Sequence, residues 1–387
     1  MEEWKTYKLA DLTVDGKGHY GIGAPAVEYD ENKYTYLRIT DINDDGSLNY
    51  AGLKSVDDPE AEKYLLKEGD IVFARTGNST GRSYFYEPSD GQFVFAGFLI
   101  KFSIDPSKVN PRFLKYYTHS KPYYEWVQSF DTGATRGNIN AQTFGSMEIT
   151  LPPRNLQDRL VEILGSLDEK IKLNNRINHN LEEQAQALYK SWFVDFEPFK
   201  DGRFVDSEVG MIPEGWHVGT LSELVEIRYG KDHKKLRDGL FPVYGSGGVM
   251  RYAEQALYEK ESVLIPRKGT LNNVMYVNHP FWTVDTMFYT VGKIEHTIKY
   301  AHLYLLTQDL ASMNAGSAVP SMTTDILNKL VVLVPSKTVL NNFDKILSAL
   351  YHGIEKRHKE CSCLSSTRDG LLPRLLSCEV EMDSITC

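Results

Sequence analysis

The sequence repeats itself, and this repetition limits the folds that the chain can adopt. "WKTYKLADL" from Trp4 matches "WHVGTLSEL" from Trp216, a shift of 212 positions. "LKEGDIVFARTG", ending at Gly77, matches "YEKESVLIPRKG", ending at Gly269, at a shift of 192. A third pair, "GATRGNIN" and "GSAVPSMT", is shifted by 183. Three collinear matches with a falling shift predict two copies of one fold, with shorter loops in the second copy.

Each copy combines β-rich stretches with helical ones. Runs such as "YTYLRIT", "DIVFAR" and "NVMYV" are bounded by Gly, Asn and Asp, which is typical of short strands. We therefore predict an α+β fold with two pseudo-repeated, β-rich globular parts, each followed by a long helix. The predicted boundaries are 1–152 for the first globular part, 153–195 for its long helix, 196–215 for a linker, 216–335 for the second globular part, 336–380 for its long helix and 381–387 for a tail.

The two predicted long helices carry apolar residues at steps of mostly three, four or seven positions. Such spacing produces one apolar stripe along a helix, and a helix this long cannot bury its stripe alone. We expect the two helices to pack together, with Asn174 as a polar residue within the stripe. The residues predicted to form the seam are Leu160, Ile163, Leu167, Ile171, Leu181, Leu188, Phe343, Ile346, Leu350, Ile354, Leu364 and Leu371.

The segment "GNSTGRS", residues 77–83, superficially resembles a phosphate-binding loop. Three residues, not four, separate its glycines, and Arg82 stands where that motif has lysine. The residues that follow, "SYFYEP", favour a strand rather than the helix that such a loop requires. A glycine-containing hairpin turn is the better interpretation.

The composition fits a soluble protein with ample core, since 42% of the 387 residues are hydrophobic. No apolar run is long enough to cross a membrane, and the first residues do not form a signal peptide. The four cysteines show no zinc spacing, and the ten histidines suggest no metal site. We expect a cytoplasmic protein without a cofactor or metal of its own. The net charge of −9 means that any nucleic-acid surface is local or completed by a partner.

With its two divergent globular parts and two similar long helices, the chain resembles the specificity subunit of type I restriction–modification systems. The segments "LPPRNLQDRLVEILGSLDEKIKLNNRIN", "KSWFVDFEPF" and "GMIPEGW" carry the most specific part of this resemblance. The resemblance implies two target-recognition domains, each reading one half of a split sequence in double-stranded DNA. It also implies that the long helices pair antiparallel as a coiled-coil spacer that docks two methyltransferase subunits. Those subunits carry S-adenosylmethionine and methylate adenine, and a translocating restriction subunit joins them.

Several polar segments are candidates for contact with DNA. "RYGKDHKKLR", residues 228–237, has five basic residues against one acidic residue, which suits phosphate neutralisation. The Gly-rich turns near Arg75, Arg136 and Arg267 offer arginine and asparagine for phosphates or base edges. The candidate DNA-binding residues are Arg75, Thr76, Asn78, Arg82, Arg136, Asn138, Asn140, Arg228, Lys231, Lys234, Lys235, Arg237, Arg267, Lys268, Asn272 and Asn273.

Catalytic motifs are not evident, so we predict a non-catalytic subunit. An adenine methyltransferase needs an Asn/Asp-Pro-Pro-aromatic signature, whereas the segment 110–113 reads Asn-Pro-Arg-Phe. Two alternatives stay open. One is a scaffold that binds only proteins, and the other is a divergent methyltransferase or nuclease, which would bind S-adenosylmethionine or cut DNA by itself.

Overall fold

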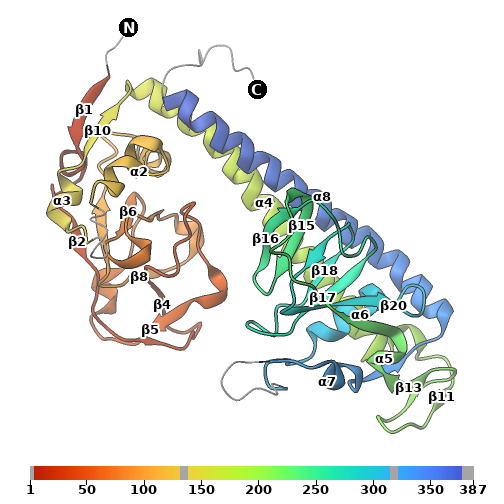
Figure 1. The fold of residues 1–387 in the computed structure, drawn as a ribbon. Coiled ribbons are helices and arrows are strands. Elements are labelled where there is room, and N and C mark those ends of the chain that lie inside the picture. The colour runs from red at the N-terminus through yellow and green to blue at the C-terminus, as the bar shows by residue number, and fades with distance from the viewer. Residues whose placement is uncertain (1–3, 131–137, 314–320, 377–387) are drawn as a thin grey trace. The chain divides into compact units, whose positions relative to one another are not determined.

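The computed structural model describes residues 4–130, 138–313 and 321–376. The chain divides into two compact units, one drawn from 1–172 and 362–387 and the other from 173–361. Each unit combines a globular part made of strands and short helices with one end of each of two long helices, α4 (Arg154–Phe193) and α8 (Lys337–Leu376) (Figure 1). The predicted α+β fold with two globular parts is confirmed.

The globular part of the first unit contains two four-stranded sheets and a two-stranded ribbon. The sheets have the strand orders β2-β9-β6-β7 and β3-β5-β4-β8, and the ribbon pairs β1 with β10. The strands are β1 Lys5–Lys8, β2 His19–Tyr20, β3 Ala26–Val27, β4 Tyr34–Leu37, β5 Lys54–Val56, β6 Asp70–Ala74, β7 Ser83–Phe85, β8 Phe93–Phe95, β9 Leu99–Ser103 and β10 Glu148–Leu151. The helices are α1 Pro111–Tyr117, α2 Lys121–Gln128 and α3 Ala141–Gly145.

The second unit has the same plan. Its main sheet has the order β14-β20-β17-β18, a smaller sheet has the order β16-β15-β19, and β13 pairs with β21. Its strands are β11 Phe204–Val205, β12 Ile212–Pro213, β13 His217–Thr220, β14 Val225–Tyr229, β15 Asp238–Gly245, β16 Gly248–Ala253, β17 Ser262–Pro266, β18 Met275–Val277, β19 Trp282–Thr283, β20 Met287–Gly292 and β21 Val331–Val334. Its helices are α5 Leu221–Leu224, α6 Ile298–Leu306 and α7 Thr324–Asn328.

The duplication is visible in individual hydrogen bonds. The Leu9 amide donates to the Met147 carbonyl at 2.9 Å, and the Leu221 amide donates to the Leu330 carbonyl at 2.9 Å. The donors of these two bonds lie 212 positions apart and the acceptors 183 apart, which are two of the shifts found in the sequence. Equivalent strands therefore close equivalent ribbons, and the pseudo-repeat in the sequence is a repeat of backbone geometry. The turn at residues 77–83 links the antiparallel strands β6 and β7, as predicted.

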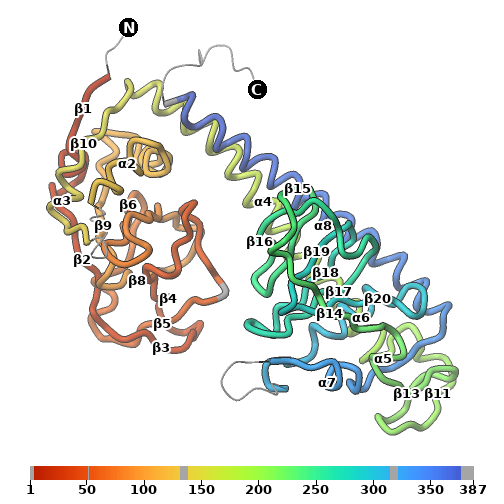
Figure 2. The backbone as a smooth tube through the Cα atoms, in the orientation of Figure 1, coloured from red at the N-terminus to blue at the C-terminus, as the bar shows by residue number. Residues whose placement is uncertain are grey.

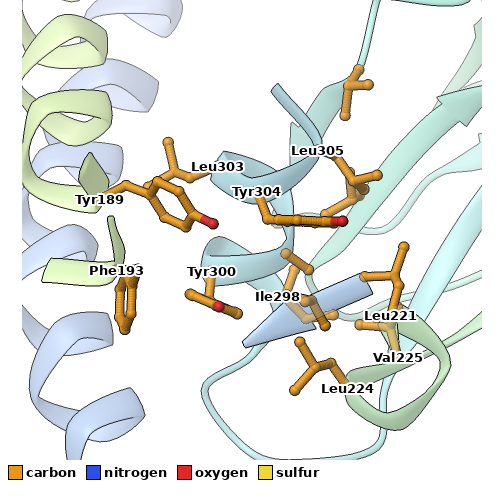
Figure 3. Packing of buried hydrophobic residues seen from close by; sticks show 14 of the residues in the cluster. Tyr189, Phe193, Leu221, Leu224, Val225, Ile298, Tyr300, Leu303, Tyr304 and Leu305 are labelled. Carbon is orange, nitrogen blue, oxygen red and sulfur yellow. The ribbon is translucent and has the colours of Figure 1, made fainter. Parts of the chain in front are cut away.

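Within each unit, α4 and α8 lie antiparallel and share the core of that unit. In the first unit Leu160 and Leu164 of α4 belong to the same buried cluster as Leu372 and Leu375 of α8. In the second unit residues of both helices pack with α6 and the ribbon strands (Figure 3). The aromatic residues Tyr189 and Phe193 contact Tyr300 there, with ring centroids 5.6 and 4.7 Å apart.

The seam differs from the predicted one in its register. Leu160 and Phe343 are fully buried, as expected, but Ile346 is 44% exposed and its neighbour Leu347 is buried instead. Steps of three and four positions do not decide between Ile346 and Leu347 as the buried residue. The globular part also covers one side of each helix, so the apolar stripe does not mark the helix–helix contact alone. Half-buried positions are Ile163, Leu167, Ile171, Leu181, Leu188, Leu350, Ile354, Leu364 and Leu371.

The middle part of α4 buries polar side chains rather than apolar ones. Asn174 is 1% exposed and donates from Nδ2 to Glu360 at 3.0 Å. Asn178 is 3% exposed, and its Nδ2 lies 3.4 Å from the Ile354 carbonyl. Asp168 is 8% exposed. Buried polar groups in a helix seam favour one register, because a shift would break the bonds that Asn174 and Asn178 donate across it.

The segment predicted as a linker, 196–215, is folded against the second globular part. It forms a short turn at Glu197–Phe199 and the strand pair β11–β12. Its backbone can be followed at the label β11 in Figure 2. Phe199 packs edge-on against Trp192 and Trp216, with centroids 5.8 and 5.0 Å apart. Its Pro and Gly residues predicted a turn-rich segment, but its three phenylalanines provide enough apolar surface to dock it.

We predict that Asp168→Asn lowers the free energy of unfolding of the first unit by about 1.5–3 kcal/mol, because a neutral amide cannot replace the buried carboxylate that accepts from Lys115 and Arg368. Burial raises the pKa of Asp168, but Lys115 and Arg368 outweigh this and hold it below the usual 3.8. The stabilisation is therefore complete above pH 3.8 and is lost as the pH falls through the lower folded-state pKa. Urea unfolding at pH 7 and pH 3 measures both effects. Glu169→Gln, next along the helix and exposed, is the matched control and should change little.

Candidate nucleic-acid interface

In the first unit, an arginine lies over an exposed tyrosine at one edge of the main sheet. The Arg75 guanidinium carbon is 5.0 Å from the ring centroid of Tyr20, which ends β2. Both β2 and β6 pair antiparallel with β9, so they run in the same direction and end at the same edge. Arg75 directly follows β6, and its long side chain crosses the end of β9 to reach the tyrosine. Its Nε and Nη2 each lie 3.4 Å from Asn138 Oδ1.

The second unit contains the same arrangement. Arg267 directly follows β17, and its guanidinium carbon is 5.4 Å from the ring centroid of Tyr229, which ends β14. Here β20 lies between the two strands and pairs antiparallel with each. The Nη1 atom of Arg267 is 3.3 Å from the Asp285 carbonyl. We name these two constellations the Tyr20–Arg75 pair and the Tyr229–Arg267 pair.

A glycine after each tyrosine explains why the ring stands at this edge. A Cβ on Gly21 would lie 2.2 Å from the Phe95 carbonyl oxygen, and a Cβ on Gly230 would lie 2.0 Å from the Val284 carbonyl oxygen. Only glycine allows the backbone to approach this closely. The chain therefore turns against the neighbouring strand at once, which leaves the preceding tyrosine at the edge.

The backbone of each arginine is held by matching hydrogen bonds. The Arg75 carbonyl accepts from the Ile139 amide at 2.9 Å, and the Arg267 carbonyl accepts from the Met322 amide at 2.9 Å. The arginine amides donate to the carbonyls of Phe98 at 3.1 Å and Thr286 at 2.9 Å, respectively. The base of each side chain is thus fixed on both sides.

Each tyrosine hydroxyl lies at the first residue of a short helix. The Ala141 amide of α3 donates to the Tyr20 hydroxyl at 3.1 Å, and the Tyr229 hydroxyl is 3.5 Å from Thr324 Oγ1 of α7. Ala141 and Thr324 are 183 positions apart, like the third repeat in the sequence. Both pairs are therefore built from the same four backbone segments.

The other predicted residues of the first unit divide into two groups. Asn78 is exposed in the turn Gly77–Ser79, and Thr76 forms a backbone bridge with Asn138 beside Arg75. Arg82, by contrast, donates to Asp44 at 2.7 Å and to the Ile42 carbonyl at 3.0 Å, which fixes a loop.

Asn140 also has a structural role, since its side chain caps α3 by accepting from the Thr143 amide at 2.9 Å. The side chains of Asn140 and Arg82, both predicted to contact DNA, are therefore used in bonds within the protein. Arg136 lies outside the described residues.

In the predicted basic loop of the second unit, only some of the positive charges are free of a carboxylate partner among the described residues, and so available to bind phosphate. Arg228 is paired with Glu226 at 2.7 Å, and Arg237 is paired with Glu254 at 2.7 Å. The three lysines between them are exposed, namely Lys231, Lys234 and Lys235. The loop therefore offers lysines, rather than arginines, to a phosphate backbone.

Of the remaining candidates, Lys268 is exposed and forms a backbone bridge with Ser321 next to Arg267. The two asparagines bind within the protein instead. Asn272 donates to Asp309 at 3.2 Å and accepts from the Ala311 amide, and Asn273 donates to the Ser246 carbonyl at 2.7 Å. Sequence reasoning recognised these as polar turn residues but could not show that the turns use them internally.

Sequence reasoning missed Tyr20 and Tyr229. The available signal is that each tyrosine precedes a glycine, but Tyr244-Gly245 has the same pattern and, within the described residues, no arginine lies over its ring. Among the described residues, no group of three or more His, Cys, Asp or Glu side chains is suited to hold a metal ion. No helix in the described part of the chain is both long and apolar enough to cross a membrane.

Comparison with known proteins identifies the class to which this fold belongs. The family described as "Type I restriction modification DNA specificity domain" matches residues 1–183 and 213–360, and the chain therefore belongs to this family. Members of the family are non-catalytic recognition subunits, so the chain is a DNA-recognition subunit and not an enzyme.

Particular relatives match most or nearly all of the chain. The HindI specificity subunit of Haemophilus influenzae is 23% identical over 98% of this chain and 100% of its own length. The MjaIX specificity subunit of Methanocaldococcus jannaschii is 25% identical over 70% of each chain. The crystal structure of a type I S subunit from M. genitalium has the same fold, with a TM-score of 0.57, 19% identity and 96% of each chain covered.

If the exposed lysines of the basic loop contact phosphates, reversing Lys234 and Lys235 to Glu should weaken binding to all DNA sequences alike. The dependence of log affinity on log salt should flatten by about one for each phosphate that the loop no longer neutralises. Affinity titrations of the complex with its methyltransferase at several salt concentrations measure this slope. The control is Lys260→Glu, at an exposed lysine of the same unit outside the loop. An unchanged slope would show that the lysines of the loop do not contact phosphates.

Proposed function

We propose that this subunit recognises a split sequence in double-stranded DNA, with one half read by each globular part. The observation that carries the proposal is the duplicated pair of arginine and tyrosine at the same sheet edge of both units. Two copies of one recognition surface on one chain suit two separate DNA sites. The residues around the pairs differ, with Asn138 beside one arginine and Ser321 in the matching position of the other copy, which suits two different half-sites.

The chemistry is then supplied by other subunits. We propose that two methyltransferase subunits carrying S-adenosylmethionine dock on the paired helices and methylate adenine in each half-site. A translocating restriction subunit completes the cleaving complex. The net charge of −9 supports this division, because an acidic chain needs basic partner surfaces to hold DNA firmly.

Exchange of one globular part should change one half of the target only. The exchange should cover 216–335, because β13 and β21 pair with each other and must be replaced together. Mapping of methylated adenines in cells that carry the chimera and its methyltransferase should then show one altered half-site and one unchanged half-site. The reciprocal exchange of 1–152 is the matched control and should alter the other half. Changes in both halves from a single exchange would contradict independent reading.

We also propose that the length of the paired helices sets the gap between the half-sites. Insertion of four residues in both helices, after Leu181 and after Gly353, lengthens each by about 6 Å and rotates its stripe by only about 40° beyond one turn. These two positions face each other, since a Cβ on Gly353 would lie 3.4 Å from Leu181 Cδ1. The methylated target should keep both half-sites and gain one or two base pairs between them, at about 3.4 Å per pair. An active double insertion with an unchanged gap would refute this role of the helices.

A further inference from the structure

Arg75 and Arg267 differ from several other arginines of the two globular parts in that, within the described residues, no carboxylate is paired with them. Arg82, Arg228 and Arg237 are each paired with a carboxylate at 2.7 Å. Within the part of the chain that the structure describes, Arg75 and Arg267 make no such ion pair. Their charge is therefore available to a ligand, and the tyrosine face substitutes for an anion beneath the guanidinium plane.

The hydrogen bonds of these two arginines to the protein are also long. The Arg75 donors lie 3.4 Å from Asn138, and the Arg267 donor lies 3.3 Å from the Asp285 carbonyl. Normal N–H···O bonds are about 2.9–3.0 Å long, so these contacts orient the donors without satisfying them. Each guanidinium lies over a tyrosine ring, and its donors can still form stronger bonds.

We propose that Arg75 and Arg267 each recognise a guanine in one half-site, and that Tyr20 and Tyr229 are positioning residues that fix the plane of the guanidinium. Two adjacent in-plane donors match the O6 and N7 acceptors that guanine alone presents side by side in the major groove. A phosphate can also accept the guanidinium fork, but such a contact carries no sequence information, so substitution of the base separates the two ligands. This inference rests on the proposed reading of split DNA sequences.

The structure explains how the plane is fixed. The backbone on both sides of each arginine is hydrogen-bonded, so only the side chain has freedom to move. The ring below it is held by the close approach of Gly21 or Gly230 and by the contact of its hydroxyl with α3 or α7. Loss of the ring would release the guanidinium, whereas loss of the hydroxyl alone removes one of the two restraints and keeps the ring on the backbone that Gly21 or Gly230 positions.

The test uses the complex of the full chain with its methyltransferase. Methylation rates are measured on duplexes that carry every single substitution in each half-site. Arg75→Ala should reduce discrimination at one guanine by about 10- to 100-fold, with the other half-site unaffected. Tyr20→Ala should reduce the same discrimination, and Tyr20→Phe should preserve it. Tyr29→Ala is the matched control, since Tyr29 is 57% exposed and no arginine of the described residues lies over its ring.

Equivalent substitutions at Arg267 and Tyr229 should affect one guanine of the other half-site, and they provide a second trial if a variant of the first pair does not fold. Unchanged discrimination in Arg75→Ala and Arg267→Ala overturns the proposal. A uniform loss of rate on all duplexes, with a flatter salt dependence, overturns it in favour of phosphate contact. Unchanged discrimination after Tyr→Ala overturns the positioning role. If the wild-type complex methylates no split sequence at all, the proposed function itself fails, which is a different result.

Discussion

The docking of the first globular part on the long helices depends on the hydrogen bonds and ion pairs of the buried carboxylate of Asp168. It accepts Lys115 of α1 at 2.8 Å, the Tyr116 hydroxyl at 3.0 Å and Arg368 of α8 at 3.0 Å. One side chain of α4 thus joins the globular part to both long helices. A buried ion is costly unless its partners satisfy it, and loss of one partner is therefore far more damaging than loss of an exposed ion pair. This specifies one docking geometry of the recognition sheet on the helices.

The second unit solves the same problem with the charges exchanged. Lys299 of α6, only 7% exposed, binds Glu261 at 3.0 Å and Asp344 of α8 at 2.8 Å. Burial lowers the pKa of Lys299, but these carboxylates outweigh it and raise the pKa above the usual 10.5. In both units a lysine of the globular part binds an aspartate of a long helix, but the buried central charge is Asp168 in the first unit and Lys299 in the second. Fixed docking matters because an arginine that reads a base must be placed relative to the helices and not only to its own sheet.

The sequence predicted the duplication, the fold class and the arginines at the matched Arg-x-Gly positions. It could not locate the tyrosines, because Tyr20 lies 55 residues before Arg75 whereas Tyr229 lies only 38 residues before Arg267. Because the loops between tyrosine and arginine differ in length, the equivalence of Tyr20 and Tyr229 becomes visible only in the sheet. The seam was predicted one residue out of register at Ile346, and Asp168 could not be predicted as a seam residue, since nothing in the sequence places Lys115 opposite it. Turn asparagines such as Asn273 look like surface ligands until their partners are known.

The comparison of the two units separates what recognition requires from what it varies. The two units share the backbone bonds at Arg75 and Arg267, the glycine after each tyrosine and the tyrosine ring beneath the guanidinium. The neighbouring side chains differ, with Asn138 in one copy and Ser321 in the other. A frame made of main-chain bonds tolerates exchange of the side chains around it, because main-chain bonds do not depend on residue type. If each pair reads one half-site, as we propose, substitutions around a constant arginine can change the sequence of that half-site, while the docking of that unit on the helices stays the same.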